Sequence, residues 1–216
     1  MGFAFILPTS RRLLAGRDLA AEGRADTAAR AAALRHDYER WSRWLLGLVA
    51  FVVTIVAGFV ATGMVAIIAA FDSISTVDLV VVCAAAIVCV AGGTTLVVLW
   101  RSGRVLARAA STGLRAVYGG EDLSPSFWRW ARVRLVHGEP RVLARLISGT
   151  LALLLAVGGF ALVVRDLAAG ASLFTLPTLL VAVCSALSGV GQIGGVMRIV
   201  QGMSAGDPVY ARRHRR

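Results

Sequence analysis

Residues 44–71 read WLLGLVAFVVTIVAGFVATGMVAIIAAF and contain no charged side chain. The most polar groups in this stretch are the hydroxyls of Thr54 and Thr62. A helix needs about 20 predominantly apolar residues to cross the roughly 30 Å of hydrocarbon in a bilayer. This stretch is longer than that, so it predicts a transmembrane helix.

Three more stretches meet the same length requirement, at residues 77–100, 142–164 and 173–197. Of the 216 residues, 57% are hydrophobic and 16% are charged, and the mean hydropathy is +0.75. This composition excludes a water-soluble globular domain and a disordered chain. We therefore predict an all-α polytopic membrane protein with four transmembrane helices. We expect two tandem helical hairpins of the same orientation, with amphipathic helices in the cytoplasm.

The basic residues set the expected orientation. All 23 are arginines: eight precede the first span, nine lie between residues 101 and 145, five lie from residue 198 onward, and Arg165 is the exception. Cytoplasmic loops retain positive charge during insertion, so both termini and the middle loop are predicted to be cytoplasmic. A chain rich in Ala, Gly and Val without any lysine indicates a GC-rich bacterial genome. We therefore expect a multi-pass protein of the bacterial cytoplasmic (inner) membrane.

These boundaries divide the chain into five segments. The two apolar hairpins occupy residues 44–100 and 142–200. The remaining segments are a cytoplasmic amphipathic helical segment, an arginine-rich loop with an interfacial part, and a basic cytoplasmic tail, at residues 1–43, 101–141 and 201–216.

The first segment has its own helical pattern. Leu34, Tyr38, Trp41 and Leu45 recur at intervals of three or four residues, which predicts one apolar face. We expect one helix that begins near Asp26 and runs directly into the first span.

The two hairpins resemble each other at an offset of 101 residues. An ungapped self-comparison gives 14 identities over residues 34–93. A duplication would relate the halves by an axis along the membrane normal, and it predicts that Cys83 meets Cys184 and Gly58 meets Gly159. The alternative is that similar spans simply use similar residues, because roughly half as many identities would arise from shared composition.

The middle loop combines tryptophan with arginine. Trp128 and Trp130 are interleaved with Arg129, Arg132 and Arg134. An interfacial segment on an anionic leaflet uses such a mixture, since apolar insertion adds to about 1 kcal/mol per basic residue near the surface. We expect contact with anionic phospholipid or with a protein partner. Nucleic acid is not expected, because the topology already accounts for the arginines.

The fourth span carries the most polar group predicted at depth, the amide of Gln192. Gly191 and Gly195 form a GxxxG pattern, and Ser188 extends the same small-residue face. We interpret this face as a helix packing surface in which Gln192 finds a partner across an interface. Lining of a pore is the functional alternative.

Chemistry-bearing motifs are absent from the sequence. No ionisable residue lies near the centre of a span, and the histidines have no metal-binding spacing. No catalytic or nucleotide-binding motif occurs. We therefore predict no catalytic residue, cofactor or metal site.

Two functions from different classes remain. The first is a non-enzymatic subunit or accessory component of a membrane assembly, whose arginine-rich face contacts lipid or a membrane-protein partner. The second is a small channel or transport component, which would have to be a homo-oligomer because four slim apolar helices cannot enclose a wide aqueous path. A membrane-embedded lipid-modifying enzyme is a weaker third.

Overall fold

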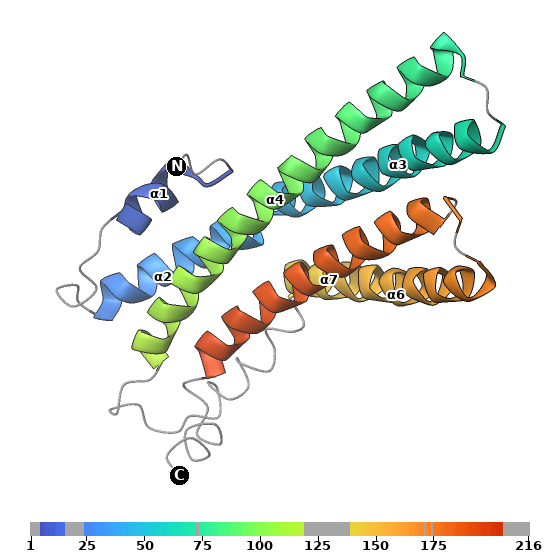
Figure 1. Cartoon of the computed structure of the whole chain (residues 1–216). Helices are drawn as coiled ribbons and strands as arrows, with labels where there is room; N and C mark the ends of the chain where they lie inside the picture. Colours follow the sequence, from blue (N-terminus) through green and yellow to red (C-terminus); the bar gives the residue numbers. More distant parts are fainter. Residues whose placement is uncertain are drawn as a thin grey trace. The chain divides into compact units, whose positions relative to one another are not determined.

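The computed structural model describes residues 5–15, 24–71, 74–118, 139–170, 172–173 and 175–204, and the regular secondary structure within them is helical throughout (Figure 1). This confirms the predicted all-α class. The helices are α1 (Pro8–Ala15), α2 (Arg24–Glu39), α3 (Trp41–Phe71), α4 (Thr76–Tyr118), α6 (Pro140–Ala169) and α7 (Thr175–Ser204).

Four of these helices, α3, α4, α6 and α7, are long and apolar enough to span a membrane. Their best windows have mean hydropathies of 2.5, 2.4, 2.3 and 1.8. The prediction of four such helices is therefore confirmed. Each is longer than its predicted span, and α4 continues from the span as far as Tyr118.

The stretch from Ala25 to Phe71 runs as one long helix, as predicted from the sequence, with a single irregular residue in it. α2 ends at Glu39 and α3 begins at Trp41, and the Arg40 carbonyl between them still accepts a hydrogen bond from the Trp44 N–H at 3.2 Å. The expected apolar face also changes environment here: Leu34 and Tyr38 are buried, whereas Trp41 and Leu45 are exposed. The predicted face therefore packs against protein only on the α2 side of Arg40.

The chain divides into two compact units, each formed by several segments. Unit 1 comprises residues 1–44, 99–147 and 193–216, and unit 2 comprises residues 45–98 and 148–192. Unit 1 thus gathers α1, α2 and one end of each long helix. All arginines except Arg165 belong to unit 1.

Unit 1 has a hydrophobic core of its own. On α4, Leu106, Ala107, Ala110 and Leu114 face this core, with Leu106 fully buried. The other members are Ile6, Ala31, Leu34, Tyr38, Val142, Val196 and Ile199. Segments that are distant in the sequence are therefore packed around a single apolar centre.

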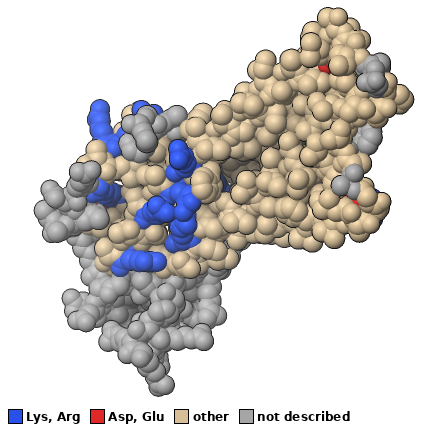
Figure 2. All heavy atoms as spheres, viewed as in Figure 1, with Lys and Arg blue, Asp and Glu red and all other residues tan. Residues whose placement is uncertain are grey.

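Unit 2 has its large apolar side chains on the outside. Val56, Val157 and Leu187 are each more than half exposed, and many other Val, Leu and Ile side chains share this property. Its charged residues among those described are Asp78, Arg165 and Asp166. On the face seen in Figure 2, arginine side chains gather over unit 1, and the described surface of unit 2 is almost free of charge.

Small residues let the helices of unit 2 approach closely. A Cβ added to Gly189 of α7 would lie 2.9 Å from the Gly149 carbonyl oxygen of α6. A Cβ on Gly92 of α4 would collide with the Thr54 hydroxyl of α3. Unit 2 is therefore held by helix contacts at which a methyl group does not fit, as expected for packing among lipid-soluble helices.

Candidate functional site

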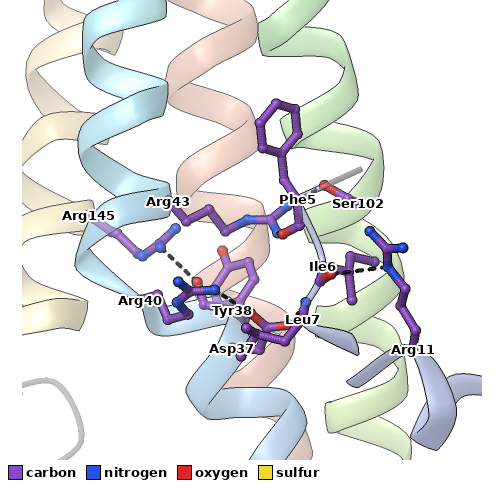
Figure 3. Close-up of polar contacts among 10 residues, drawn as sticks. All are labelled: Phe5, Ile6, Leu7, Arg11, Asp37, Tyr38, Arg40, Arg43, Ser102 and Arg145. Carbon is purple, nitrogen blue, oxygen red and sulfur yellow. Dashed lines mark hydrogen bonds and ion pairs between the residues drawn. The ribbon is translucent and has the colours of Figure 1, made fainter. Parts of the chain in front are cut away.

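The main polar feature of the described residues is a group of charged side chains inside unit 1, which we call the ionic cluster. It holds four guanidinium and three carboxylate groups, from Arg35, Asp37, Glu39, Arg40, Arg43, Glu139 and Arg145. Part of it is drawn in Figure 3. The sequence alone does not predict this cluster.

Asp37 anchors the amino-terminal segment. Its side chain is only 1% exposed, and its Oδ2 accepts a hydrogen bond from the Leu7 backbone N–H at 3.0 Å. Its Oδ1 lies 3.6 Å from Arg40 Nη1 and has no hydrogen-bond partner among the described residues. The carboxylate therefore fixes the residues before α1 against α2 (Figure 3).

Arg43 connects three segments of the chain. Its Nη1 donates to the Phe5 carbonyl oxygen at 3.1 Å, and its Nη2 donates to the Leu99 carbonyl oxygen at 2.7 Å and to the Ser102 hydroxyl. One guanidinium thus joins the amino-terminal segment, α3 and α4. The planar, multi-donor geometry of arginine suits such a junction, which a lysine ammonium could not reproduce.

Arg145 attaches α6 to α2 through Tyr38. Its Nη2 donates to the Tyr38 carbonyl oxygen at 2.8 Å, and its Cζ lies 4.6 Å from the centre of the Tyr38 ring. A cation placed over an aromatic ring is attracted by its quadrupole, more strongly when both are desolvated. Both residues are buried, so this contact is shielded from water.

Arg35 binds two carboxylates. It pairs with Glu39 at 2.6 Å within α2 and with Glu139 at the start of α6. Burial lowers the pKa of the Arg35 guanidinium, but the hydrogen bonds and charges of Glu39 and Glu139 outweigh that effect and raise the pKa above its ordinary value. Arg35 therefore stays charged at any physiological pH.

The contacts of the ionic cluster indicate a structural role, because they hold segments of unit 1 together. Its cations are directed at carbonyl oxygens and carboxylates of the same unit, and it presents no nucleophile paired with a base. Within the described parts of the chain, no three His, Cys, Asp or Glu residues are grouped to hold a metal ion.

A second basic feature lies on the exposed side of α4. Arg101, Arg104, Arg108 and Arg115 follow one another at intervals of three, four and seven residues, which places them on one helix face. We call this face the arginine stripe. None of the four has a carboxylate partner among the described residues. Arg104 lies over the Trp100 ring, 4.6 Å from its centre.

Gln192 lies where α7 meets α6. Its Oε1 accepts a hydrogen bond from Ser148 Oγ at 2.6 Å, and its Nε2 donates to Ser188 Oγ at 3.4 Å. The first bond joins two helices, which favours the packing interpretation of Gln192 over a pore lining. Ser188 was predicted only as part of the small-residue face of α7, and Ser148 was not predicted because it lies 44 residues away in the sequence.

Gly191 and Gly195, the two glycines of the GxxxG pattern, differ in their burial and their neighbours. A Cβ on Gly195 would collide with the Tyr38 hydroxyl, so this glycine admits an aromatic side chain from α2. Gly191 is half-buried on α7. The packing partner of Gly195 is thus an aromatic ring, which a pattern typical of paired helices does not predict.

Two of the residues predicted to meet across a repeat axis, Gly58 and Gly159, lie at close helix contacts. A Cβ on Gly58 would lie nearest to Leu180 and Cys89, and one on Gly159 nearest to Ala182. A strict repeat would give Gly159 the counterpart of Cys89, which is Val190. Cys83 is exposed and Cys184 is half-buried. Both glycines are close-packing points, and the 101-residue duplication stays a prediction.

The tryptophan and arginine residues proposed to contact lipid lie outside the described residues. These are Trp128, Arg129, Trp130, Arg132 and Arg134. The basic tail from residue 205 onward lies outside them as well.

Comparisons with known proteins give no relative from which a function could be transferred. No protein-family model, no curated protein and no solved structure matches this chain.

Proposed function

We propose that this chain is a non-enzymatic multi-pass protein of the bacterial cytoplasmic membrane, a subunit or accessory component whose arginine-rich cytoplasmic face binds anionic phospholipid. One observation carries the proposal: unit 2 is apolar on its surface, and unit 1 holds every arginine except Arg165. The apolar surface of unit 2 is suited to the hydrocarbon of a bilayer. The positive-inside rule assigns the arginine-rich unit 1 to the cytoplasm.

The helix contacts support two hairpins in unit 2. Positions 50 and 54 of α3 lie against position 92 of α4, and position 58 lies against position 89, so the two helices run in opposite directions. The contacts of Gly159 with Ala182 and of Gly189 with Gly149 give α6 and α7 the same relation. Each hairpin of this kind returns the chain to the side of the membrane on which the hairpin began. Both termini then lie in the cytoplasm.

The arginine stripe supports recognition of anionic lipid. Trp100 marks the interface, where indole rings prefer to lie, and Arg101 and Arg104 follow it directly. Arg108 and Arg115 lie about 10 and 20 Å farther along the helix than Arg101, because an α-helix rises 1.5 Å per residue. The Debye length is about 8 Å at physiological salt, so Arg101 and Arg104 face the headgroups. The two distant arginines favour an acidic protein partner as the second candidate.

Cysteine labelling tests the topology. In a variant in which Cys83, Cys89 and Cys184 are replaced by Ala, single cysteines are introduced at the exposed positions Ala33, Thr112, Ser75 and Ser172. In sealed cells, an impermeant maleimide should label positions 75 and 172 and should reach 33 and 112 only after lysis. Labelling of position 33 or 112 from outside would overturn the proposed orientation.

Two charge-matched double variants test the lipid role. Arg101→Gln/Arg104→Gln and Arg108→Gln/Arg115→Gln each remove two charges from the same helix face. In nanodiscs that mix phosphatidylglycerol with phosphatidylcholine, the first pair should lower the enrichment of the anionic lipid around the protein, and the second pair should leave it nearly unchanged. If only the second pair matters, the stripe binds a protein partner.

A further inference from the structure

A groove in unit 2 has a polar end and an apolar wall. It encloses about 170 Å³ and is bordered by α3, α6 and α7. Leu48 and Phe51 of α3, with Leu151 and Leu155 of α6, form the apolar wall. Ser148, Ser188 and Gln192 form the polar end. All of these residues belong to unit 2.

The polar end has an unused hydrogen-bond donor. Gln192 Oε1 is occupied by the short bond from Ser148, whereas Nε2 makes one long bond of 3.4 Å to Ser188 among the described residues. A primary amide carries two N–H donors. One N–H of Gln192 is therefore available to a carbonyl acceptor in the groove, and an amide in hydrocarbon gains from such a partner because water is absent.

The position of the groove along the helices matches one part of a phospholipid. Ser148 lies three residues from Arg145 on α6, and Gln192 lies six residues from Arg198 on α7. At 1.5 Å per residue these are separations of about 5 and 9 Å along the helices. The polar end of the groove therefore lies slightly deeper in the bilayer than Arg145 and Arg198. Leu155 lies about 10 Å deeper than Ser148 on α6. The polar end thus falls at the level of the lipid esters and the apolar wall at the level of the acyl chain.

We propose that this groove binds one acyl chain of a phospholipid from the cytoplasmic leaflet, with its ester carbonyl accepting a hydrogen bond from Gln192 Nε2. The inference rests on the proposed function, since it requires unit 2 in the bilayer with the arginines on the cytoplasmic side. It adds a defined site for a lipid tail, separate from the headgroup contacts of the arginine stripe.

A comparison of two lipids tests the hydrogen bond without altering the protein. The full chain is placed in nanodiscs that contain traces of a phosphatidylglycerol with a photoreactive diazirine in one acyl chain, either as the diester or as the diether of the same chain length. The diester should cross-link to groove residues about fivefold more than the diether, since one ordinary hydrogen bond has that effect on occupancy. Gln192→Leu should remove this preference.

A pair of tryptophan variants tests the location. Leu155→Trp fills the deep end of the groove, whereas Leu154→Trp places the same ring on a neighbouring side chain that is exposed and does not line the groove. The first should lower cross-linking several-fold, and the second should leave it unchanged. Equal cross-linking of diester and diether in the unaltered protein, or an equal effect of both tryptophans, would overturn the site.

The site and the proposed function fail in different ways. Loss of the anionic-lipid enrichment in Arg101→Gln/Arg104→Gln with an intact ester preference supports two separate lipid contacts. If the arginine variant leaves the enrichment unchanged while the ester preference holds, the headgroup role fails and the groove stands. If the maleimide reaches position 33 or 112 from outside sealed cells, the orientation is wrong and the inference fails with it.

Discussion

Unit 1 encloses several charged groups: Asp37 is almost inaccessible, and Arg145 is buried between α6 and the Tyr38 ring. In unit 2 the large apolar side chains lie outside, as Val157 shows with 67% exposure. Unit 1 is built around an apolar core and is joined by charged contacts. Unit 2 presents its apolar surface outward and packs closely at glycines. This difference is what the proposed function predicts for one unit in the cytoplasm and the other in the bilayer.

The largest expected effect comes from the carboxylate inside unit 1. Asp37→Ala leaves the Leu7 N–H without its acceptor and leaves Arg40 without its nearby anion, so it should lower the free energy of unfolding by about 3–5 kcal/mol. Denaturant titration of the protein in nanodiscs measures this. Asp26→Ala, at an exposed position of the same helix, is the control and should cost less than about 1 kcal/mol. A small effect of Asp37→Ala would show that the ionic cluster does not stabilise unit 1.

A single charge on the outside of unit 2 should have a comparable effect for a different reason. Val157→Arg lies near the middle of α6, and a guanidinium at the centre of a membrane helix costs about 2.5–3.5 kcal/mol on insertion scales. Val105→Arg, on the exposed side of α4 in unit 1, should be tolerated. The amount of protein in the membrane fraction and the labelling of Ser172→Cys report insertion. Equal tolerance of both variants would mean that the outside of unit 2 does not face lipid.

A methyl group should disturb unit 2 where two helices touch. Gly189→Ala places a Cβ 2.9 Å from the Gly149 carbonyl oxygen, which belongs to the α6 backbone and cannot turn aside. The overpacking should cost about 1–3 kcal/mol. The matched variant is Gly158→Ala, since a Cβ there meets nothing within 4 Å and should be neutral or slightly stabilising. Similar thermal midpoints for the two proteins would argue against close packing of α6 and α7.

The four long helices and the ionic cluster differ in how far the sequence predicts them. The helices were predictable, because a run of about 20 apolar residues forms few structures other than a transmembrane helix. The ionic cluster was not, since its contacts join residues far apart in the chain: Leu7 to Asp37, and Tyr38 to Arg145 across 107 positions. One signal was present, because Asp37 and Glu39 stand among Arg35, Arg40 and Arg43 just before the first span. Acids so placed suggest buried pairing, but they do not identify partners on other helices.

The smallest expected effect has the opposite sign. Ser185 of α7 is fully buried in unit 2, and its hydroxyl has no hydrogen-bond partner among the described residues. An unpaired buried hydroxyl costs free energy in the folded state, and alanine removes it with little change in volume. Ser185→Ala should therefore stabilise the protein by up to about 1 kcal/mol, which raises the thermal midpoint by a few degrees at most. Ser102→Ala is the informative counterpart, because its hydroxyl in unit 1 bonds Arg43 and the Leu99 carbonyl oxygen and its loss should destabilise. If Ser185→Ala also destabilises, unit 2 depends on a polar contact at that hydroxyl in addition to the bond between Ser148 and Gln192, and the contrast between the two units would be weaker.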